Sequence, residues 1–253
     1  MNIKMFQRIG ILYLVMFLAV PFYVFAQQGA TGAPETAVEE KSPRDEYTEA
    51  ERPEENYLAR FEGIRVSEKL MKENLENIFI LKVIVSNFKD QGWDKDYQDI
   101  YENYKKGVSL FYRRIVVYSR VELEKNKKAI SELYKKMVTL YRKDTHALLK
   151  ECADKILDFS LEEKNKYDPN RSRILFKNMM RLWIAYGQVD DAESSYIENV
   201  FRSSISHYRI AKSYAISILE QLDPEKSKGR FDIQKADNRN RILNPEKVEK
   251  PKT

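Results

Sequence analysis

Residues 94–168 read DKDYQDIYENYKKGVSLFYRRIVVYSRVELEKNKKAISELYKKMVTLYRKDTHALLKECADKILDFSLEEKNKYD, with no proline and one glycine, Gly107. Proline and glycine are the residues that most disfavour a helix interior, so this run predicts one very long helix or a few long ones. Its apolar side chains recur at steps of three and four: Ile130, Leu133, Met137, Leu140, Leu148, Cys152, Ile156 and Phe159. We expect a helix with one buried face, and any break near Gly107 or Asn126.

The flanking segments show the same helical periodicity. Before the run, an apolar stripe over 57–88 predicts a helix that ends at Gly92. After it, Asp168-Pro169 predicts a break, followed by a helix over about 171–186 that Gly187 ends. In that helix we expect an inward-facing set: Ile174, Leu175, Met179, Leu182 and Trp183. A last long helix, capped by Asp190 or Asp191, is expected to end at Leu222, and residues 231–243 predict a short additional one.

The composition fits this helical pattern. Only eight glycines and eight prolines occur in 253 residues, with 43% apolar and 33% charged side chains. The sequence therefore predicts an all-α protein, an elongated helical bundle or hairpin with one very long central helix and a C-terminal helix-turn-helix.

The N-terminus has the features of an export signal. Lys4 and Arg8 precede the 15-residue run ILYLVMFLAVPFYVF at 11–25, which contains no charged or amide side chain. A membrane-spanning helix needs about 20 apolar residues, so the run favours a signal peptide over 1–26, cleaved within VFAQQGA after Ala26. We expect no stable membrane insertion after cleavage. An uncleaved anchor is the alternative, since Ile9 and Gly10 extend the run.

The remaining chain divides by charge. Residues 27–56 carry nine acidic side chains against three basic ones and almost no large apolar residue, which predicts a disordered acidic linker. Residues 57–243 are expected to form the elongated helical domain, and 244–253 a disordered charged tail.

Residues suited to catalysis or metal binding are few. Cys152 is the only cysteine, and it follows His146 by six residues, which places the two on different sides of a helix. His207 is the only other histidine, so standard zinc-ligand spacing is absent from the sequence. We therefore predict a protein that is not an enzyme, with no catalytic residue, cofactor or metal.

Basic residues are frequent within 125–143, but acidic side chains alternate with them and the predicted export argues against a nucleic-acid partner. A second cluster is more suggestive of protein binding, because tyrosine and arginine are enriched at interface hot spots. We predict a partner-binding role for six residues: Phe111, Tyr112, Arg113, Arg114, Tyr118 and Arg120.

The C-terminal third supplies a family resemblance. HYRIAKSYAISILEQLDPEK at 207–226 and QKADNRNRIL at 234–243, together with the signal peptide, acidic leader and long helix, resemble the flagellar-coiling proteins of Leptospira. The resemblance implies a periplasmic sheath component that binds the flagellar filament core and other sheath proteins, imposes filament coiling and supports motility. The alternatives are a periplasmic helical adaptor or envelope scaffold unrelated to flagella, and a secreted host-interaction protein.

Overall fold

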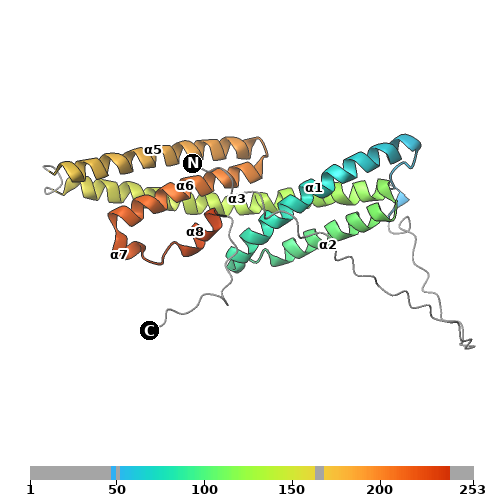
Figure 1. The fold of residues 1–253 in the computed structure, drawn as a ribbon, viewed down its shortest axis with the longest axis horizontal. Helices are drawn as coiled ribbons and strands as arrows, with labels where there is room; N and C mark the ends of the chain where they lie inside the picture. Colours follow the sequence, from blue (N-terminus) through green and yellow to red (C-terminus); the bar gives the residue numbers. More distant parts are fainter. Residues whose placement is uncertain (1–46, 50–51, 163–167, 240–253) are drawn as a thin grey trace, which may run out of the picture. The chain divides into compact units, whose positions relative to one another are not determined.

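The computed structural model describes residues 47–49, 52–162 and 168–239. Within these ranges it has seven α-helices, one 3-10 helix and no strand (Figure 1). The long helices are α1 (Tyr57–Asn87), α2 (Asp94–Tyr112), α3 (Val116–Leu161), α5 (Pro169–Ile197) and α6 (Phe201–Leu222). The short ones are η3 (Lys89–Gln91), α7 (Pro224–Ser227) and α8 (Asp232–Asn238). The predicted all-α class with a long central helix is confirmed.

Some predictions fall outside these ranges. The signal peptide 1–26, the tail 244–253 and most of the linker 27–56 lie outside the described residues, and the predicted domain boundaries stay predictions. All the helices belong to one compact unit, Pro43–Thr253.

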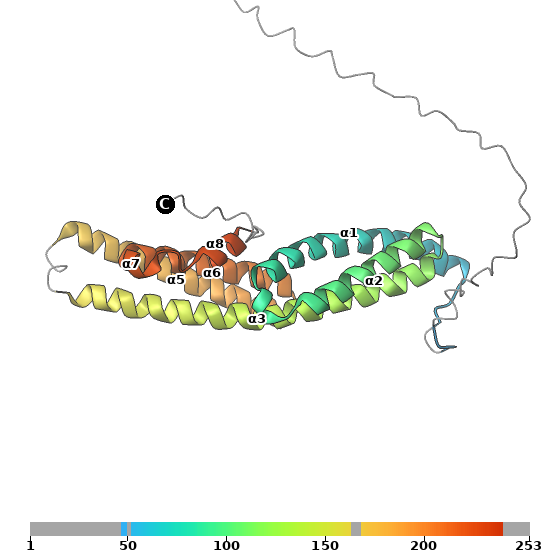
Figure 2. The same cartoon turned by 90° about the horizontal axis from the view of Figure 1, so that it is seen from below.

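Helix α3 is the element that two bundles share. Its 46 residues extend about 69 Å at 1.5 Å per residue. Its first half packs against α1 and α2, where Asn74 Nδ2 donates to the Leu123 carbonyl at 2.9 Å. Its second half packs against α5 and α6, as both views show (Figures 1 and 2). We call α1, α2 and the first half of α3 the N-terminal bundle, and the second half of α3 with α5 and α6 the C-terminal bundle.

One continuous hydrophobic core joins the two bundles. Leu81 and Ile84 of α1, Met137 of α3 and Ile218 of α6 are all fully buried in it. The stripe predicted along α3 faces this core, with Leu140 and Phe159 only partly buried. Its periodicity therefore identified the buried face of α3 correctly.

The predicted break within 94–168 is in the wrong place. Gly107 and Asn126 both lie inside helices, and the chain turns instead between α2 and α3 at Arg113–Ile115. Arg114 there has a positive φ of 63°, and the Ile115 amide donates to the Leu110 carbonyl at 2.9 Å. This is the pattern of a Schellman helix end with arginine in the position that glycine usually takes.

The connection between α5 and α6 also differs from the prediction. Gly187 does not end a helix: α5 continues through it and through Asp190 and Asp191 to Ile197. The turn follows at Glu198–Val200, where Asn199 has φ 60° and the Val200 amide donates to the Ser195 carbonyl at 2.8 Å. The helix-turn-helix thus exists but begins about ten residues later, because no residue near Gly187 adopts the left-handed conformation that ends a helix.

Helix α1 likewise ends earlier than predicted, at Asn87 and not at Gly92. Gly92 ends the following 3-10 helix η3 with φ 70°. The short helix predicted over 231–243 is found as α8 over Asp232–Asn238.

Helix α5 turns small residues toward the bundle and several large apolar ones away from it. On α5, Ala185, Val189 and Ala192 are buried, whereas Met179 and Trp183 are 52% and 71% exposed. The prediction that Met179 and Trp183 point inward is therefore wrong. The small side chains allow α5 to approach α3 and α6 closely, which leaves the large ones on the outer side.

Candidate protein-binding surface

The α2–α3 turn presents the centre of the predicted partner-binding cluster to solvent. Tyr112 is 77% exposed and its ring meets the partly buried Phe111 ring edge-on at 5.8 Å. Arg113 and Arg114 follow, both exposed. We call residues 111–114 the corner turn; it combines an aromatic pair with two guanidinium groups.

The other two predicted residues serve the fold. Tyr118 is buried, with its ring 5.0 Å from that of Tyr47. Arg120 forms an ion pair with Glu124 at 2.8 Å and another with Glu62 of α1 at 3.7 Å. The hydrogen bond to Glu124 raises the pKa of Arg120. Three of the six residues, Tyr112, Arg113 and Arg114, are thus exposed, Phe111 is half-buried beside them, and Tyr118 and Arg120 make contacts within the fold. Their role in binding a partner stays a prediction.

The start of α1 lies at the same end of the N-terminal bundle as the corner turn (Figure 1), and it adds exposed apolar side chains there. Ser67 on the inner side of α1 donates to the Val116 carbonyl at 3.5 Å, which fixes this part of α1 against the start of α3. The opposite side carries four exposed residues: Tyr57, Leu58, Phe61 and Ile64. We call these four residues and the corner turn together the corner surface.

Sequence reasoning placed Tyr57, Phe61 and Ile64 on one apolar stripe but did not identify them as exposed. The residues that indicate which side of α1 is buried lie on the other side of the helix. Gly63 lies against Val116 and leaves room for a Cβ only at contact distance, 3.4 Å from the Val116 carbonyl oxygen. Gly63 and Ser67, one turn apart, mark the side that approaches α3, so the large residues face out.

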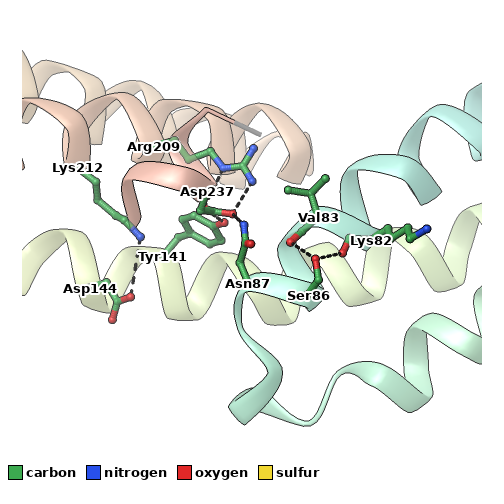
Figure 3. A network of polar contacts seen from close by, with 9 residues as sticks. All are labelled: Lys82, Val83, Ser86, Asn87, Tyr141, Asp144, Arg209, Lys212 and Asp237. Carbon is green, nitrogen blue, oxygen red and sulfur yellow. Dashed lines mark hydrogen bonds and ion pairs between the residues drawn. The ribbon is translucent and has the colours of Figure 1, made fainter. Parts of the chain in front are cut away.

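A second cluster of polar residues lies where the two bundles meet, and it is buried (Figure 3). Arg209 of α6 donates to both carboxylate oxygens of Asp237 of α8, at 2.9 and 3.2 Å. Tyr141 of α3 also donates to Asp237, and Asn87 of α1 lies 3.3 Å from it. Burial raises the pKa of Tyr141 well above its ordinary value. These contacts join four helices through one carboxylate.

Lys212 extends this cluster. Its side chain is fully buried, with Nζ 4.0 Å from Asp144 Oδ2 and 4.6 Å from the centre of the Tyr141 ring. Burial lowers the pKa of Lys212. The whole buried network holds α8 over the junction of the bundles, and we assign it a structural role.

The candidate catalytic residues are dispersed. Cys152 is fully buried, its Sγ lies 3.3 Å from the Ala215 carbonyl, and burial raises its pKa to about 12. His146 is exposed, and His207 Nδ1 lies 3.0 Å from Gln188 Oε1. Among the described residues, no three histidine, cysteine, aspartate or glutamate side chains are grouped to hold a metal ion.

None of the helices described in 47–49, 52–162 and 168–239 combines the length and apolar character that crossing a bilayer requires.

Comparison with known families gives one match. Residues 62–167, less than half of the chain, match the family described as surface protein adhesin OmpL37. The matched family is described as one of surface proteins, which supports an association of this chain with the cell envelope. No curated protein and no solved structure matches the chain.

This match corrects the function that the sequence resemblance implied. The matched family is one of surface adhesins and not of flagellar sheath components, so the prediction of a flagellar sheath protein that coils the filament is wrong. The resemblance rested on the overall layout and on short C-terminal blocks, whereas the match covers most of α1, all of α2 and all of α3.

Proposed function

We propose that this chain is a non-enzymatic surface protein of the cell envelope that binds an extracellular protein, as an adhesin does. The observation that carries the proposal is the match of residues 62–167 to a surface adhesin family. That range includes the corner turn and part of the adjoining α1 surface. The predicted signal peptide at 1–26 supplies the route of export.

The chemistry of the corner surface suits a protein partner. Tyrosine and arginine dominate interface hot spots, because each combines a large contact area with directed hydrogen bonding. Contiguous exposed apolar side chains, such as Tyr57 and Phe61 on α1, mark interaction sites in soluble domains. The exposed guanidinium group of Arg114 favours a partner that offers carboxylates.

The absence of enzymatic activity is part of the proposal. The only thiol, Cys152, is buried and protonated at neutral pH, so it is a poor nucleophile. Tyr141 and Lys212, whose pKa values burial raises and lowers respectively, belong to the buried network. Surface contact, and not chemistry, is the activity that this arrangement supports.

The test uses a variant that removes the binding groups while favouring the fold. Tyr112→Ala truncates an exposed side chain, and Arg114→Gly places glycine where φ is already positive, which relieves strain of about 1 kcal/mol. The matched control, Ile210→Ala with Asn199→Gly, truncates another exposed apolar side chain and alters the equivalent position of the α5–α6 turn.

Binding is measured by surface plasmon resonance against an array of purified extracellular-matrix and plasma proteins. We expect saturable binding to at least one of them, weakened about thirtyfold or more in the corner variant and unchanged in the control. Binding to none of the proteins, or equal binding by the two variants, contradicts the proposal.

A further inference from the structure

The outer side of α5 carries a row of large apolar side chains that no helix of the described chain covers. Its members are Phe176, Met179, Met180, Trp183 and Tyr186, all exposed. The core side of α5 lies opposite, where Ala185, Val189 and Ala192 pack against α3 and α6. A row of this kind on a soluble helix indicates an interface.

A groove between α3 and α5 continues this apolar surface. It has a volume of about 500 Å³ and is lined by Ile156 and Leu157 of α3 and by Leu175, Met179 and Trp183 of α5, among others. A large side chain covers on the order of 150–250 Å² when fully buried, and the five members of the row are 41–71% exposed, so the row offers roughly 400–700 Å², to which the groove adds. A standard protein interface takes about 800 Å² from each partner, which this face alone approaches.

The charges of α5 identify what fits the row. Its first half, 169–181, contains Arg171, Arg173, Lys177 and Arg181 and no acidic residue. Its second half, 182–197, contains Asp190, Asp191 and Glu193 and no lysine or arginine. Arg171 pairs with Glu162 and Glu193 with Arg142 within the chain, so the exposed charges are Arg173 and Lys177 in the first half and Asp190 and Asp191 in the second. The apolar row runs along both halves.

This distribution is complementary to itself. When two copies of α5 lie antiparallel, the basic half of each meets the acidic half of the other, whereas a parallel pair would bring like charges together. Arg173, Lys177 and Asp191 are exposed on the same flank of the row. In an antiparallel pair, corresponding flanks face one another, so the opposite charges meet directly.

We propose that the outer face of α5, with the α3–α5 groove, forms a symmetric homodimer in which two α5 helices pack antiparallel about a two-fold axis near Trp183. An isologous interface requires one self-complementary patch, and both the apolar row and the charge pattern meet that requirement. The dimer does not depend on the proposed adhesin function, because it uses a different helix from the corner surface.

Gly187 adds a feature that the monomer leaves unexplained. It lies exposed within α5, about one turn after Trp183, and a Cβ built there would meet nothing within 4 Å. Glycine in a helix interior costs stability relative to residues with a side chain. In the dimer, an axis near Trp183 brings Met180 of one copy within one residue of the level of Gly187 of the other, on the same flank of the row, where the missing side chain leaves room.

The first test is sedimentation equilibrium of the purified chain. We expect a reversible dimer, and a matched pair of variants locates the interface: Trp183→Gln should weaken the dimer about thirtyfold or more, while Phe79→Gln, at a similarly exposed position on α1, should leave it unchanged. Gly187→Gln should also weaken the dimer without loss of helicity, because glutamine favours the helix. A monomer up to on the order of 100 µM, or a dimer that Trp183→Gln does not weaken, overturns the proposal.

The second test addresses the antiparallel orientation. Arg173→Glu with Lys177→Glu should dissociate the dimer, because the flank that carries Asp191 is then acidic along both halves of α5. Adding Asp190→Lys and Asp191→Lys to the same chain should restore the dimer, since the charges on that flank are then reversed but again self-complementary. A four-fold variant that stays monomeric while folded, or a two-fold variant that dimerises like the parent chain, excludes the antiparallel arrangement.

Discussion

Replacement of Asp237 by alanine tests the role of the buried network at the bundle junction. The carboxylate is fully buried and accepts hydrogen bonds from Arg209, from Tyr141 and from Asn87 (Figure 3). Its removal leaves the Arg209 guanidinium in the core without its ion-pair partner. Loss of one partner of a buried ion pair costs about 3–5 kcal/mol. For a domain of this size, that corresponds to a fall in Tm of roughly 6–20 °C.

The assay is urea unfolding followed by circular dichroism, carried out as a double-mutant cycle. Asp237→Leu and Arg209→Met are each expected to destabilise the chain strongly. The double variant removes both charges and is expected to recover most of the loss, because an apolar pair avoids the desolvation of two ions. The recovery is the part that distinguishes an ion pair from simple packing.

Detachment of α8 sets the upper limit of this effect. Helix α8 has only seven residues, so if it leaves the bundle in the Asp237→Ala variant, water reaches Arg209 and the loss equals the free energy that docks α8. Hydrogen exchange at 232–238 reports that event. A loss below about 1 kcal/mol with the α8 amides still protected would refute the assignment of this network as the element that holds α8.

Three further predictions concern single sites. Gly107→Ala should destabilise the chain by about 1–3 kcal/mol, because the new Cβ would lie 2.9 Å from the buried Leu123 side chain on α3. Gly187→Ala, measured at a concentration where the chain is monomeric, should instead stabilise it by up to about 1 kcal/mol, because alanine favours a helix interior. Chemical denaturation gives both values. Tyr118→Ala should cost about 3–5 kcal/mol and Tyr112→Ala less than about 0.5 kcal/mol, and similar losses for both would contradict their opposite burial. Burial raises the pKa of Cys152 from 9.0 to about 12. The stability that its protonated thiol contributes is therefore fully present below pH 9 and is lost between about pH 9 and 12. The difference in unfolding free energy between the parent chain and Cys152→Ala should change over that window and stay constant below it.

The sequence predicted the helices better than their ends. The proline-free run 94–168 predicted α2 and α3, and the stripe that includes Met137 and Ile156 identified the buried face. The turns that join α2 to α3 and α5 to α6 were predicted in the wrong places because their left-handed residues are Arg114 and Asn199 and not glycine. A non-glycine residue at a helix end gives no clear local signal, since its conformation is fixed by the packing of the helices on either side.

The exposed faces could not be read from periodicity alone. Periodicity shows which residues share a side of a helix, but α5 has apolar residues on two sides, and the side with small ones is the core. The large residues Trp183 and Met179 were therefore assigned inward. Likewise, Tyr118 and Tyr112 belong to one cluster in the sequence, yet only the fold decides that the first is buried against Tyr47 and the second faces solvent.

The most direct test of the central claim, that this chain acts at the cell surface, is antibody labelling of intact cells. Antibodies raised against the purified chain are applied to intact cells and to cells with a permeabilised outer membrane, with a known periplasmic protein as the control. The account predicts labelling of intact cells while the periplasmic control stays unlabelled. Labelling that appears only after permeabilisation would contradict it and would favour a periplasmic helical adaptor instead.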